Sequence, residues 1–396
     1  MIIAPTSFFA DYGCHVRILV EALILQRLGY EVTICTYHNG EDIEDLSIIR
    51  SSSIPWRRGH EVGSSFHKLG FDLLLSLKSL TWVLRHKPDI IHAHLHEGAL
   101  IGYPLGRLCR APLVFDFQGS LTGEMIDHGF LHRDSLFHYP LRQLEGFINR
   151  LPQIIIVSSH HAARLLREEF DCRQKEIHVL PDGVNTDLFR PGSKEQKSAL
   201  KERLGLPSQS RVVVYLGLLA EYQGTSLLLQ AAGELAESYP DLHFLIMGHP
   251  NVDHYRALAG EMGISGRVTF TGRIHYLQAP RFLDLGDVAV GPKMSATEGS
   301  GKLANYMAMG LPTVAFDTPV SREYLGEYGV YATPGDYLCL AEAISALLND
   351  EARAISLGRK LRERALELYS WPRLQETMKS IYSALTDEVR GDDMTL

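Results

Sequence analysis

The chain has 396 residues, which at roughly 150 residues per domain predicts two domains. Hydrophobic residues make up 45% and charged residues 22%, the balance of a globular protein rather than of a disordered or fibrous one. Lys and Arg number 39 against 47 Asp and Glu, and the formal net charge of −8 opposes broad DNA or RNA binding, so we expect no nucleic-acid partner.

The cysteines and the apolar segments predict a cytoplasmic protein. Cys14, Cys35, Cys109, Cys172 and Cys339 are scattered and form no C-x-x-C pair, which suits a reducing compartment better than a disulfide framework or a zinc ribbon. No stretch reaches the roughly 18 apolar residues of a membrane-spanning helix. The start, MIIAPTSFF, also lacks the basic residues and long apolar run of a signal peptide.

Apolar strands and amphipathic helices alternate along the first half of the chain. A short apolar run over residues 1–5 precedes a polar loop and a helix predicted over 15–28, with Gly29 where a helix C-cap belongs. A second helix is expected over 70–86. Further strands are expected over 31–37, 89–94, 112–117 and 153–158.

The alternation restarts after a polar stretch with Pro and Gly at both ends, residues 189–210, which we interpret as the connection between domains. Strands are expected over 211–217, 243–248, 267–271, 287–291 and 313–316, and helices over 224–238, 301–309 and 371–387. This order predicts an α/β protein with two doubly wound, Rossmann-like parallel sheets. Ligands of such folds bind at the carboxyl ends of the strands, here in a cleft between the domains.

The strongest local signal is the segment Gly291–Pro312, GPKMSATEGSGKLANYMAMGLP. Gly299 and Gly301 let the backbone approach a ligand, and the N–H groups of residues 300–303 at a helix start favour an anion, to which Lys302 adds a full charge. The run is neither a P-loop nor a dinucleotide fingerprint in its usual place, and no early G-x-G-x-x-G supports an oxidoreductase. A glycine-rich turn before a well-capped helix stays the simpler alternative.

This segment resembles the signature of the family 4 glycosyltransferases, E-G-F-G-x-x-x-x-E-A-M-A-x-G-x-P-V, with Glu298-Gly299-Ser300-Gly301 and then Asn305 to Val314. Six residues separate Glu298 from Asn305 where the family's two glutamates have seven between them, so the loop is one residue shorter. The likeness extends over residues 10–29, 87–94, 181–191 and 269–291 and over the terminal helix. It implies a GT-B fold with an acceptor domain (1–188), a nucleotide-sugar donor domain (189–368), and a final segment (369–396) whose helix crosses back to the first domain.

The same resemblance implies an activity. A hexosyl unit would pass from a UDP- or GDP-sugar to a hydroxyl acceptor, on a glycan, a lipid-linked molecule or a small molecule, with retention of configuration. No metal ion or other cofactor is implied. The leaving diphosphate takes the acceptor proton, so the protein mainly positions the substrates and stabilises charge.

The sequence departs from the family where the donor diphosphate binds. The family's G-R-L-x-x-x-K-G is here Gly217 to Gly224, with Leu218 in place of the Arg and Gln223 in place of the Lys. Each lost charge-assisted hydrogen bond is worth about 1.5–3 kcal/mol. Lys302, Lys293 and Arg17 are candidate replacements. The alternative is a catalytically inactive GT-B subunit that serves as a binding or scaffold protein.

The resemblance also assigns the remaining candidate residues. Gly13 and Cys14 lie in the loop that covers the phosphates, Glu298 would meet donor sugar hydroxyls, and Asn305 replaces the glutamate that contacts the ribose. The predicted donor-binding residues are Gly13, Cys14, Leu218, Gln223, Gly299, Ser300, Gly301, Lys302, Leu303 and Asn305. The predicted catalytic residues are Gln118, which replaces a family His near the transfer point, together with Glu298 and His94.

Two further features carry open alternatives. His92, His94 and His96 point to one face if all three lie on a strand, which could bind zinc, but contact of His94 or His96 with a substrate is the preferred interpretation and no metal is predicted. The segment from Trp56 to Lys87 is basic and rich in Leu. It could rest on the inner face of an anionic membrane and admit a lipid-linked acceptor, or simply be a core-facing helix with a polar side.

Overall fold

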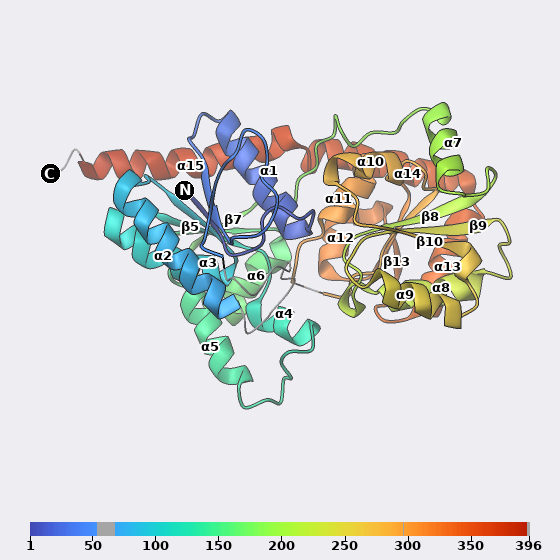
Figure 1. Ribbon diagram of the computed structural model, residues 1–396, viewed down its shortest axis with the longest axis horizontal. Helices are drawn as coiled ribbons and strands as arrows, with labels where there is room; N and C mark the ends of the chain where they lie inside the picture. The colour runs from blue at the N-terminus through green and yellow to red at the C-terminus, as the bar shows by residue number, and fades with distance from the viewer. Residues whose placement is uncertain (54–67, 296, 394–396) are drawn as a thin grey trace.

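The computed structural model describes residues 1–53, 68–295 and 297–393, which form two α/β domains side by side (Figure 1). The first domain has a seven-stranded sheet in the order β3-β2-β1-β4-β5-β6-β7, and the second a six-stranded sheet in the order β10-β9-β8-β11-β12-β13. The strand pairs of both sheets are parallel. The predicted pair of doubly wound parallel sheets is confirmed.

The first domain alternates short apolar strands with helices that cover both faces of its sheet. In β6 all four residues, Ile154–Val157, are buried, as a doubly covered parallel strand requires. Ser159 then starts the next helix by accepting a hydrogen bond from the Ala162 N–H. The strands are β1 (Ile2–Ala4), β2 (Thr33–Thr36), β3 (Ser47–Arg50), β4 (Ile91–His94), β5 (Leu113–Phe117), β6 and β7 (Glu176–Val179), and the helices are α1 (Gly13–Arg27), α2 (Lys68–His86), α3 (Leu95–Cys109), α4 (Leu121–Asp127), α5 (His138–Asn149) and α6 (His160–Glu169).

The second domain repeats this architecture. Gly310, with φ +69°, follows the end of α11, as the sequence predicts for a glycine after a helix. The strands are β8 (Arg211–Leu216), β9 (Leu242–Met247), β10 (Val268–Gly272), β11 (Val288–Gly291), β12 (Thr313–Phe316) and β13 (Val330–Ala332). The helices are α7 (Lys194–Arg203), α8 (Thr225–Leu235), α9 (Val252–Glu261), α10 (Ala279–Leu283), α11 (Gly301–Ala308), α12 (Pro319–Leu325), α13 (Tyr337–Leu348) and α14 (Glu351–Leu368).

The predicted elements miss several that the structure contains. Three of the four strands at the sheet ends, β3, β7 and β13, were not predicted. They are partly exposed and lack the continuous apolar run that marks central strands. The polar connection 189–210 contains a helix, α7, which Ser193 caps by accepting a hydrogen bond from the Gln196 N–H. Its side chains are mostly exposed, so α7 lacks the apolar face from which a helix is predicted.

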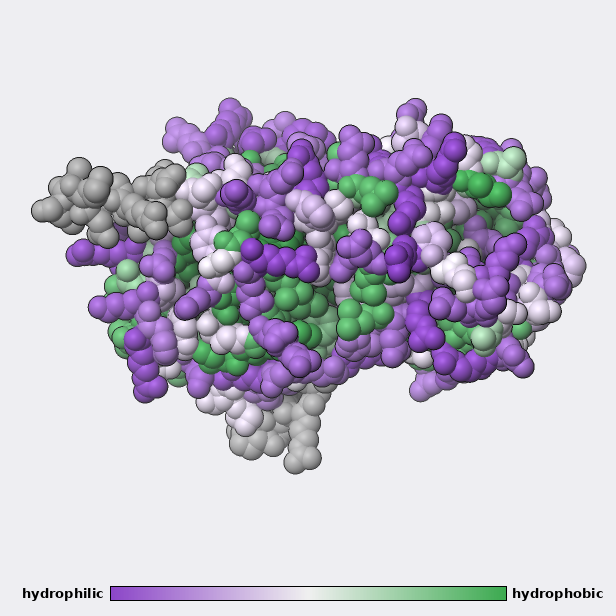
Figure 2. All heavy atoms as spheres, turned by 90° about the horizontal axis from the view of Figure 1, so that it is seen from above, coloured by the Kyte–Doolittle hydropathy of each residue, from purple (hydrophilic) through white to green (hydrophobic). Residues whose placement is uncertain are grey.

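The final helix, α15 (Trp371–Asp393), runs back along the first domain beside α1 (Figure 1). It is held there by a hydrogen bond between the Tyr382 hydroxyl and His92 Nδ1 at 2.6 Å and by the Arg27 guanidinium over the Trp371 ring at 4.9 Å. Seen from above, the molecule is covered mainly by hydrophilic side chains with smaller hydrophobic patches between them (Figure 2). Among the described helices, none is long and apolar enough to cross a membrane.

Candidate active site between the two domains

A cavity of about 310 Å³ lies between the two domains, at the carboxyl ends of strands from both sheets. Gln118, just after β5, and Gly119 belong to its first-domain wall, and Gly217 and Gly248, just after β8 and β9, belong to its second-domain wall. All the predicted site residues except His94 and Leu303 line this cavity. The expected cleft is therefore present, and it gathers segments that are far apart in the sequence.

Helix α11 points its amino end into the cavity, with Ser300 as the N-cap and Gly301 as the first helical residue. The first N–H groups of a helix have no acceptor within it, so those of residues 301 and 302 can meet an anion. Leu303, predicted to bind the donor, does not line the cavity. Its N–H donates to the Ser300 carbonyl at 2.9 Å, and its side chain is buried in the core, where a Cβ at Gly291 would touch it.

Lys302 lies beside the loop Gly217–Gly224, in which Leu218 and Gln223 replace the Arg and Lys that the family resemblance expects. Its Nζ donates to Gln223 Oε1 at 2.8 Å and to the Tyr215 hydroxyl at 3.3 Å. A Cβ at Gly217 would come within 2.7 Å of that Nζ, so the glycine leaves room for the lysine. Burial lowers the pKa of Lys302 to about 7, and the charge of Lys293 acts in the same direction.

The other two candidate replacements already have partners. Lys293 Nζ lies 2.5 Å from Glu298 Oε2 and donates to the Gly299 carbonyl at 2.9 Å, so it holds the loop in which Glu298 stands. Arg17 also lines the cavity, but its Nη2 lies 2.6 Å from the buried Asp116 Oδ1. Its Nη1 donates to the Leu180 carbonyl at 3.0 Å. Arg17 is therefore already paired within the first domain, and its role as a replacement phosphate ligand stays a prediction.

Gly299 serves the contact between domains as well as the cavity. A Cβ at this position would lie 2.5 Å from Asp182 Oδ2 and 3.0 Å from the Ser158 side chain, and both residues belong to the first domain. At Gly301 a Cβ would lie 3.5 Å from the Asp182 Cβ, an ordinary contact distance. Both glycines line the cavity, as predicted, and Gly299 also lets the donor-side loop reach the first domain, a role that the sequence did not indicate.

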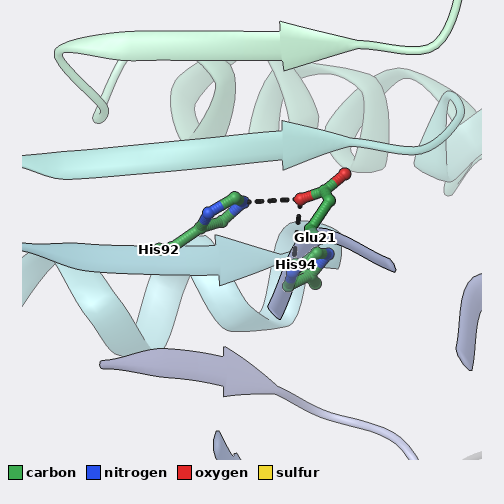
Figure 3. A group of neighbouring side chains, drawn as sticks. All are labelled: Glu21, His92 and His94. Carbon is green, nitrogen blue, oxygen red and sulfur yellow. Dashed lines mark ion pairs between the residues drawn. The ribbon is translucent and has the colours of Figure 1, made fainter. Parts of the chain in front are cut away.

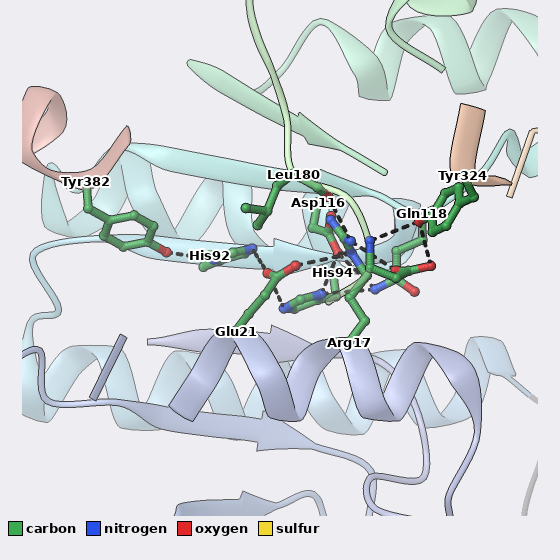
Figure 4. Close-up of polar contacts among 10 residues, drawn as sticks. Arg17, Glu21, His92, His94, Asp116, Gln118, Leu180, Tyr324 and Tyr382 are labelled. Atoms are coloured by element: carbon green, nitrogen blue, oxygen red, sulfur yellow. Dashed lines mark hydrogen bonds and ion pairs between the residues drawn. The ribbon is translucent and has the colours of Figure 1, made fainter. Parts of the chain in front are cut away.

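Gln118 lines the cavity and is held by two buried residues beneath it (Figure 4). Its Nε2 donates to Asp116 Oδ2 at 3.0 Å, and His94 Nδ1 lies 2.9 Å from the same oxygen. Burial alone would raise the pKa of Asp116, but Arg17 and His94 bring it well below its ordinary value. His94 is fully buried and does not line the cavity, so its predicted direct contact with a substrate is not met; it supports Asp116 instead.

The three histidines of 92–96 do not share one face. His92 and His94 stack with ring centroids 4.6 Å apart, whereas His96 lies in α3 with its ring against Phe115 and Phe117. The strand ends at His94, so the alternation that would align His96 with the other two stops there.

The side chains of Glu21, His92 and His94 come close enough to hold a metal ion (Figure 3). Glu21 Oε2 lies 3.2 Å from His92 Nε2 and 3.8 Å from His94 Nε2. The two imidazole planes are only 6° apart, so their Nε2 lone pairs run side by side rather than converge on one point, and Arg17 Nε already lies 3.1 Å from Glu21. A metal-free protein stays our prediction.

The first turn of α1 and the loop before it border the cavity from the first domain, and Gly13 and Cys14, predicted in that loop, are the first two residues of the helix. Both line the cavity, and burial raises the pKa of the Cys14 thiol to about 12, which makes the thiol unreactive at neutral pH. Asp11 Oδ2 lies 2.6 Å from Arg273 Nη2, and the other Asp11 oxygen accepts the Tyr276 N–H at 2.8 Å. These contacts join the loop to the second domain.

Glu124 is a cavity residue that the sequence reasoning missed. It reaches the cavity from α4, and a Cβ at Gly119 would lie 2.8 Å from Glu124 Oε1 and 2.9 Å from Glu298 Cγ, so two acidic side chains face each other across that glycine. Burial and then Glu298 raise the pKa of Glu124 to about 8. An acidic residue in the first turn of a helix is common for the helix dipole alone, so the sequence held no signal for this role.

The basic segment 56–87 is only partly described. Trp56, Arg57 and Arg58 lie outside the described residues. Lys68 lines the cavity with its Nζ 3.6 Å from Glu97 Oε1, so this lysine belongs to the site rather than to an exposed basic patch.

Known proteins match the chain over most of its length. Residues 13–188 match the family model described as Glycosyltransferase Family 4, and residues 210–350 match the model described as Glycosyl transferases group 1. The D-inositol 3-phosphate glycosyltransferase of Corynebacterium aurimucosum is 27% identical over 397 residues, which cover 94% of this chain and 90% of that protein. The phosphatidyl-myo-inositol mannosyltransferase of Mycobacterium leprae is 25% identical over 391 residues, 97% of this chain and 96% of that protein.

A solved structure shows the same fold. The crystal structure of HepE from Anabaena in complex with UDP-glucose has a TM-score of 0.76 to this chain at 16% identity, over 97% of this chain and 98% of that one. The two facing Rossmann-like domains, the cleft between them and the helix that crosses back make this architecture GT-B.

Proposed function

The chain belongs to the family 4 glycosyltransferases of GT-B fold, and on this premise we propose that it moves a hexosyl unit from a UDP- or GDP-sugar to a hydroxyl acceptor with retention of configuration. The relatives named above act on inositol phosphate and phosphatidylinositol, and HepE binds UDP-glucose. These names support a sugar-nucleotide donor and a hydroxyl acceptor for this chain. We expect the reaction to need no metal ion.

The observation that carries this proposal is the position of Lys302. Its ammonium stands at the amino end of α11 and beside Gln223, in the wall of the cleft where the donor diphosphate would lie. The helix end contributes N–H groups and partial positive charge, and Lys302 contributes a cation. Together they can offset the charge that develops on a departing diphosphate.

The cavity residues fit the remaining roles. Gln118 would hold the acceptor hydroxyl, Glu298 would bind hydroxyls of the donor sugar, and Asn305 would contact the ribose. In the transfer, the bond from the anomeric carbon to the diphosphate oxygen breaks and the bond to the acceptor oxygen forms on the same face. The acceptor proton passes to the leaving diphosphate, so the enzyme need not supply a base.

The acceptor and the place of action are part of the same proposal. The first domain would bind a hydroxyl acceptor, lipid-linked molecules included, and the protein would work in the cytoplasm with peripheral contact to the inner face of a membrane. The five cysteines are all unpaired, which supports a reducing compartment.

A donor screen tests this function. The full chain is incubated with UDP-, GDP- and ADP-sugars, and released nucleotide is measured beside the thermal shift that each nucleotide causes. We expect release from one donor class and about a 10- to 100-fold loss with Lys302→Ala, because one charge-assisted hydrogen bond is removed. Lys194→Ala, an exposed lysine of α7, is the matched control. No release and no thermal shift with any nucleotide contradict the proposal.

The alternative is a catalytically inactive GT-B subunit, a binding or scaffold protein. It is favoured by Leu218 and Gln223 and by the engagement of Lys293 and Arg17 with carboxylates. It predicts normal folding, no donor turnover and a partner enzyme in pull-down experiments. Turnover of any donor by the purified chain excludes it.

A further inference from the structure

The contacts beneath the cavity fix which end of the Gln118 side chain faces it. Asp116 lies in β5 and Gln118 directly follows that strand, so the two side chains lie on the same side of the sheet. The neighbouring strand β4 places His94 opposite Asp116 in the parallel register. Strand alternation and register therefore bring the three side chains together at the carboxyl end of the sheet (Figure 4).

Asp116 is ionised in the folded protein. The Arg17 guanidinium donates to both of its oxygens, through Nη2 to Oδ1 at 2.6 Å and through Nε to Oδ2 at 2.8 Å. Burial favours the neutral acid, but Arg17 and His94 hold the pKa of Asp116 well below its usual range. A carboxylate only accepts hydrogen bonds, so a polar group that bonds to it must bring a hydrogen.

The charge of Asp116 decides the orientation of the Gln118 amide. The group 3.0 Å from Asp116 Oδ2 must be the NH2 group, because the amide oxygen would meet the carboxylate without a hydrogen between them. Turning the amide over would replace a hydrogen bond to a charged group by a repulsive contact, which favours the inward NH2 group by about tenfold or more. His94 Nδ1 lies 3.0 Å from the same nitrogen, on the same inner side.

Oε1 is therefore the end of the Gln118 amide that a ligand can reach. Gln118 lines the cavity, and none of the residues that the structure describes donates a hydrogen bond to its Oε1. An amide oxygen has lone pairs and no hydrogen, so it can accept a hydrogen bond but cannot donate one. It suits a neutral hydroxyl group, whereas it would repel an ionised oxygen of a carboxylate or a phosphate.

We propose that Asp116 is a positioning residue, which holds the NH2 group of Gln118 inward so that Oε1 accepts a hydrogen bond from the substrate hydroxyl at the point of transfer. This role rests on the proposed function, to which it adds the atom that meets the substrate and the direction of the hydrogen bond. The amide oxygen orients the hydroxyl without taking its proton. That proton passes to the leaving diphosphate as the hydroxyl oxygen bonds to the anomeric carbon and the bond from that carbon to the diphosphate breaks.

An exchange of the acid and the amide between positions 116 and 118 tests the positioning role. In Asp116→Asn, the new amide keeps its oxygen towards Arg17 and turns its NH2 group to Gln118, so the Gln118 amide turns over. In Gln118→Glu, two carboxylates face each other and repel. In Asp116→Asn/Gln118→Glu, the new asparagine donates to one oxygen of the new glutamate, and the other oxygen faces the cavity as an acceptor.

The measurement is nucleotide release from the UDP- or GDP-sugar that the parent chain uses, with water as the acceptor. We expect each single variant to be slower by about tenfold or more, and the double variant to recover to within about threefold of the parent. The matched control, Asp134→Asn/Gln174→Glu, makes the same two changes at exposed sites of the first domain and should behave as the parent does. A double variant no faster than Asp116→Asn overturns the proposal.

Recovery in the double variant separates positioning from stability. Asp116→Asn weakens the pair with Arg17, and the change at position 118 is not expected to restore it, so Asp116→Asn and the double variant should melt at the same lowered temperature. Faster release without a higher melting temperature is then a gain that a merely structural role would not give. Affinities for UDP and GDP should be equal in all variants, because Lys302 and the amino end of α11 are unchanged.

Hydrogen exchange of the Gln118 NH2 group tests its orientation without any turnover, even if Asp116→Asn fails to fold. Magnetic resonance of the full chain, isotope-labelled on its glutamine side chains, identifies the NH2 signals of Gln118 by their loss in Gln118→Glu. In the parent these hydrogens should exchange about tenfold or more slowly than those of the exposed Gln174. Exchange as fast as at Gln174 overturns the proposal. Slow exchange in a chain that turns over no donor leaves the orientation of Gln118 standing and contradicts the proposed function instead.

Discussion

Lys302 Nζ lies 2.8 Å from Oε1 of Gln223. Gln223 stands where the family resemblance expects a diphosphate-binding lysine, so the two residues bring an ammonium to that place from a different element, α11 instead of the loop after β8. On the proposed function, the ammonium of Lys302 in α11 would replace the cation that the loop after β8 lacks. The loop keeps an uncharged side chain that can accept the hydrogen bond of the new lysine.

The first prediction concerns exchange between these two positions. Lys302→Ala should weaken binding of a nucleoside diphosphate by about 10- to 100-fold. The double variant Lys302→Ala/Gln223→Lys should recover much of that loss, because it returns the ammonium to the loop. Isothermal titration with UDP and GDP measures both affinities. A double variant that binds no better than Lys302→Ala contradicts the idea of equivalent positions.

The second prediction follows from the burial of Lys302, which lowers its pKa to about 7. At pH 8 the free protein holds this lysine mostly neutral, and a bound diphosphate favours the charged form. Binding at pH 8 should therefore take up close to one proton, and affinity should fall as pH rises above about 7. Calorimetry in two buffers of different ionisation enthalpy counts the protons.

In Lys302→Met the proton uptake should vanish. The sign for stability is opposite to that for binding. Between pH 7 and 10.5 the unfolded chain binds this proton and the folded chain does not. The free energy of unfolding should therefore rise with pH through that range, because burial of Lys302 destabilises the folded state less. Binding enthalpies that are identical in the two buffers would falsify the assignment of the proton to Lys302.

The third prediction concerns Glu124. Its burial, and then the charge of Glu298, raise its pKa to about 8. Above pH 4.5 the unfolded chain loses the Glu124 proton, whereas the folded protein keeps it up to about pH 8. The contribution of the protonated Glu124 to the free energy of unfolding is therefore lost as pH rises from 4.5 towards 8. Glu124→Gln imitates the protonated form. Relative to wild type, its melting temperature should rise by about 1–3 °C between pH 5 and pH 8.5.

Glu261→Gln, at an exposed site on α9, is the control for the loss of one carboxylate. If the difference in melting temperature between Glu124→Gln and wild type does not change with pH, Glu124 is already ionised at neutral pH and the prediction is contradicted.

The fourth prediction separates structural from ligand-binding cations. Arg17→Met leaves Asp116 buried without its main partner, at a cost of about 3–5 kcal/mol, which corresponds to a fall of about 6–20 °C in the melting temperature of the first domain. Arg256→Met removes an exposed partner of Asp253 and should change the melting temperature little. A small effect of Arg17→Met, together with lost nucleotide binding, would return Arg17 to the list of phosphate ligands.

Much of the fold follows from patterns within single elements. Residues 313–316 were predicted as a strand and form β12, since a short apolar run after Gly310 and Pro312 has clear boundaries. Strand β13 (Val330–Ala332), at the end of the second sheet, was not predicted because it is partly exposed and its sequence lacks a continuous apolar run.

The site was less predictable, because its chemistry depends on contacts between distant residues. The sequence placed Lys302 near a helix start, but its hydrogen bond to Gln223 joins positions 79 residues apart. His94 was predicted to contact a substrate, and only the fold shows that it pairs with Asp116, which in turn accepts a hydrogen bond from Gln118. Glu124 gained its role from Glu298, which comes from the other domain.

A crystal structure of the full chain with bound UDP or GDP tests the placement of the diphosphate most directly. We predict a β-phosphate oxygen within hydrogen-bond distance of Lys302 Nζ, and another at the backbone N–H groups of residues 301 and 302. A diphosphate bound elsewhere in the cleft, with Lys302 still paired to Gln223, would contradict it.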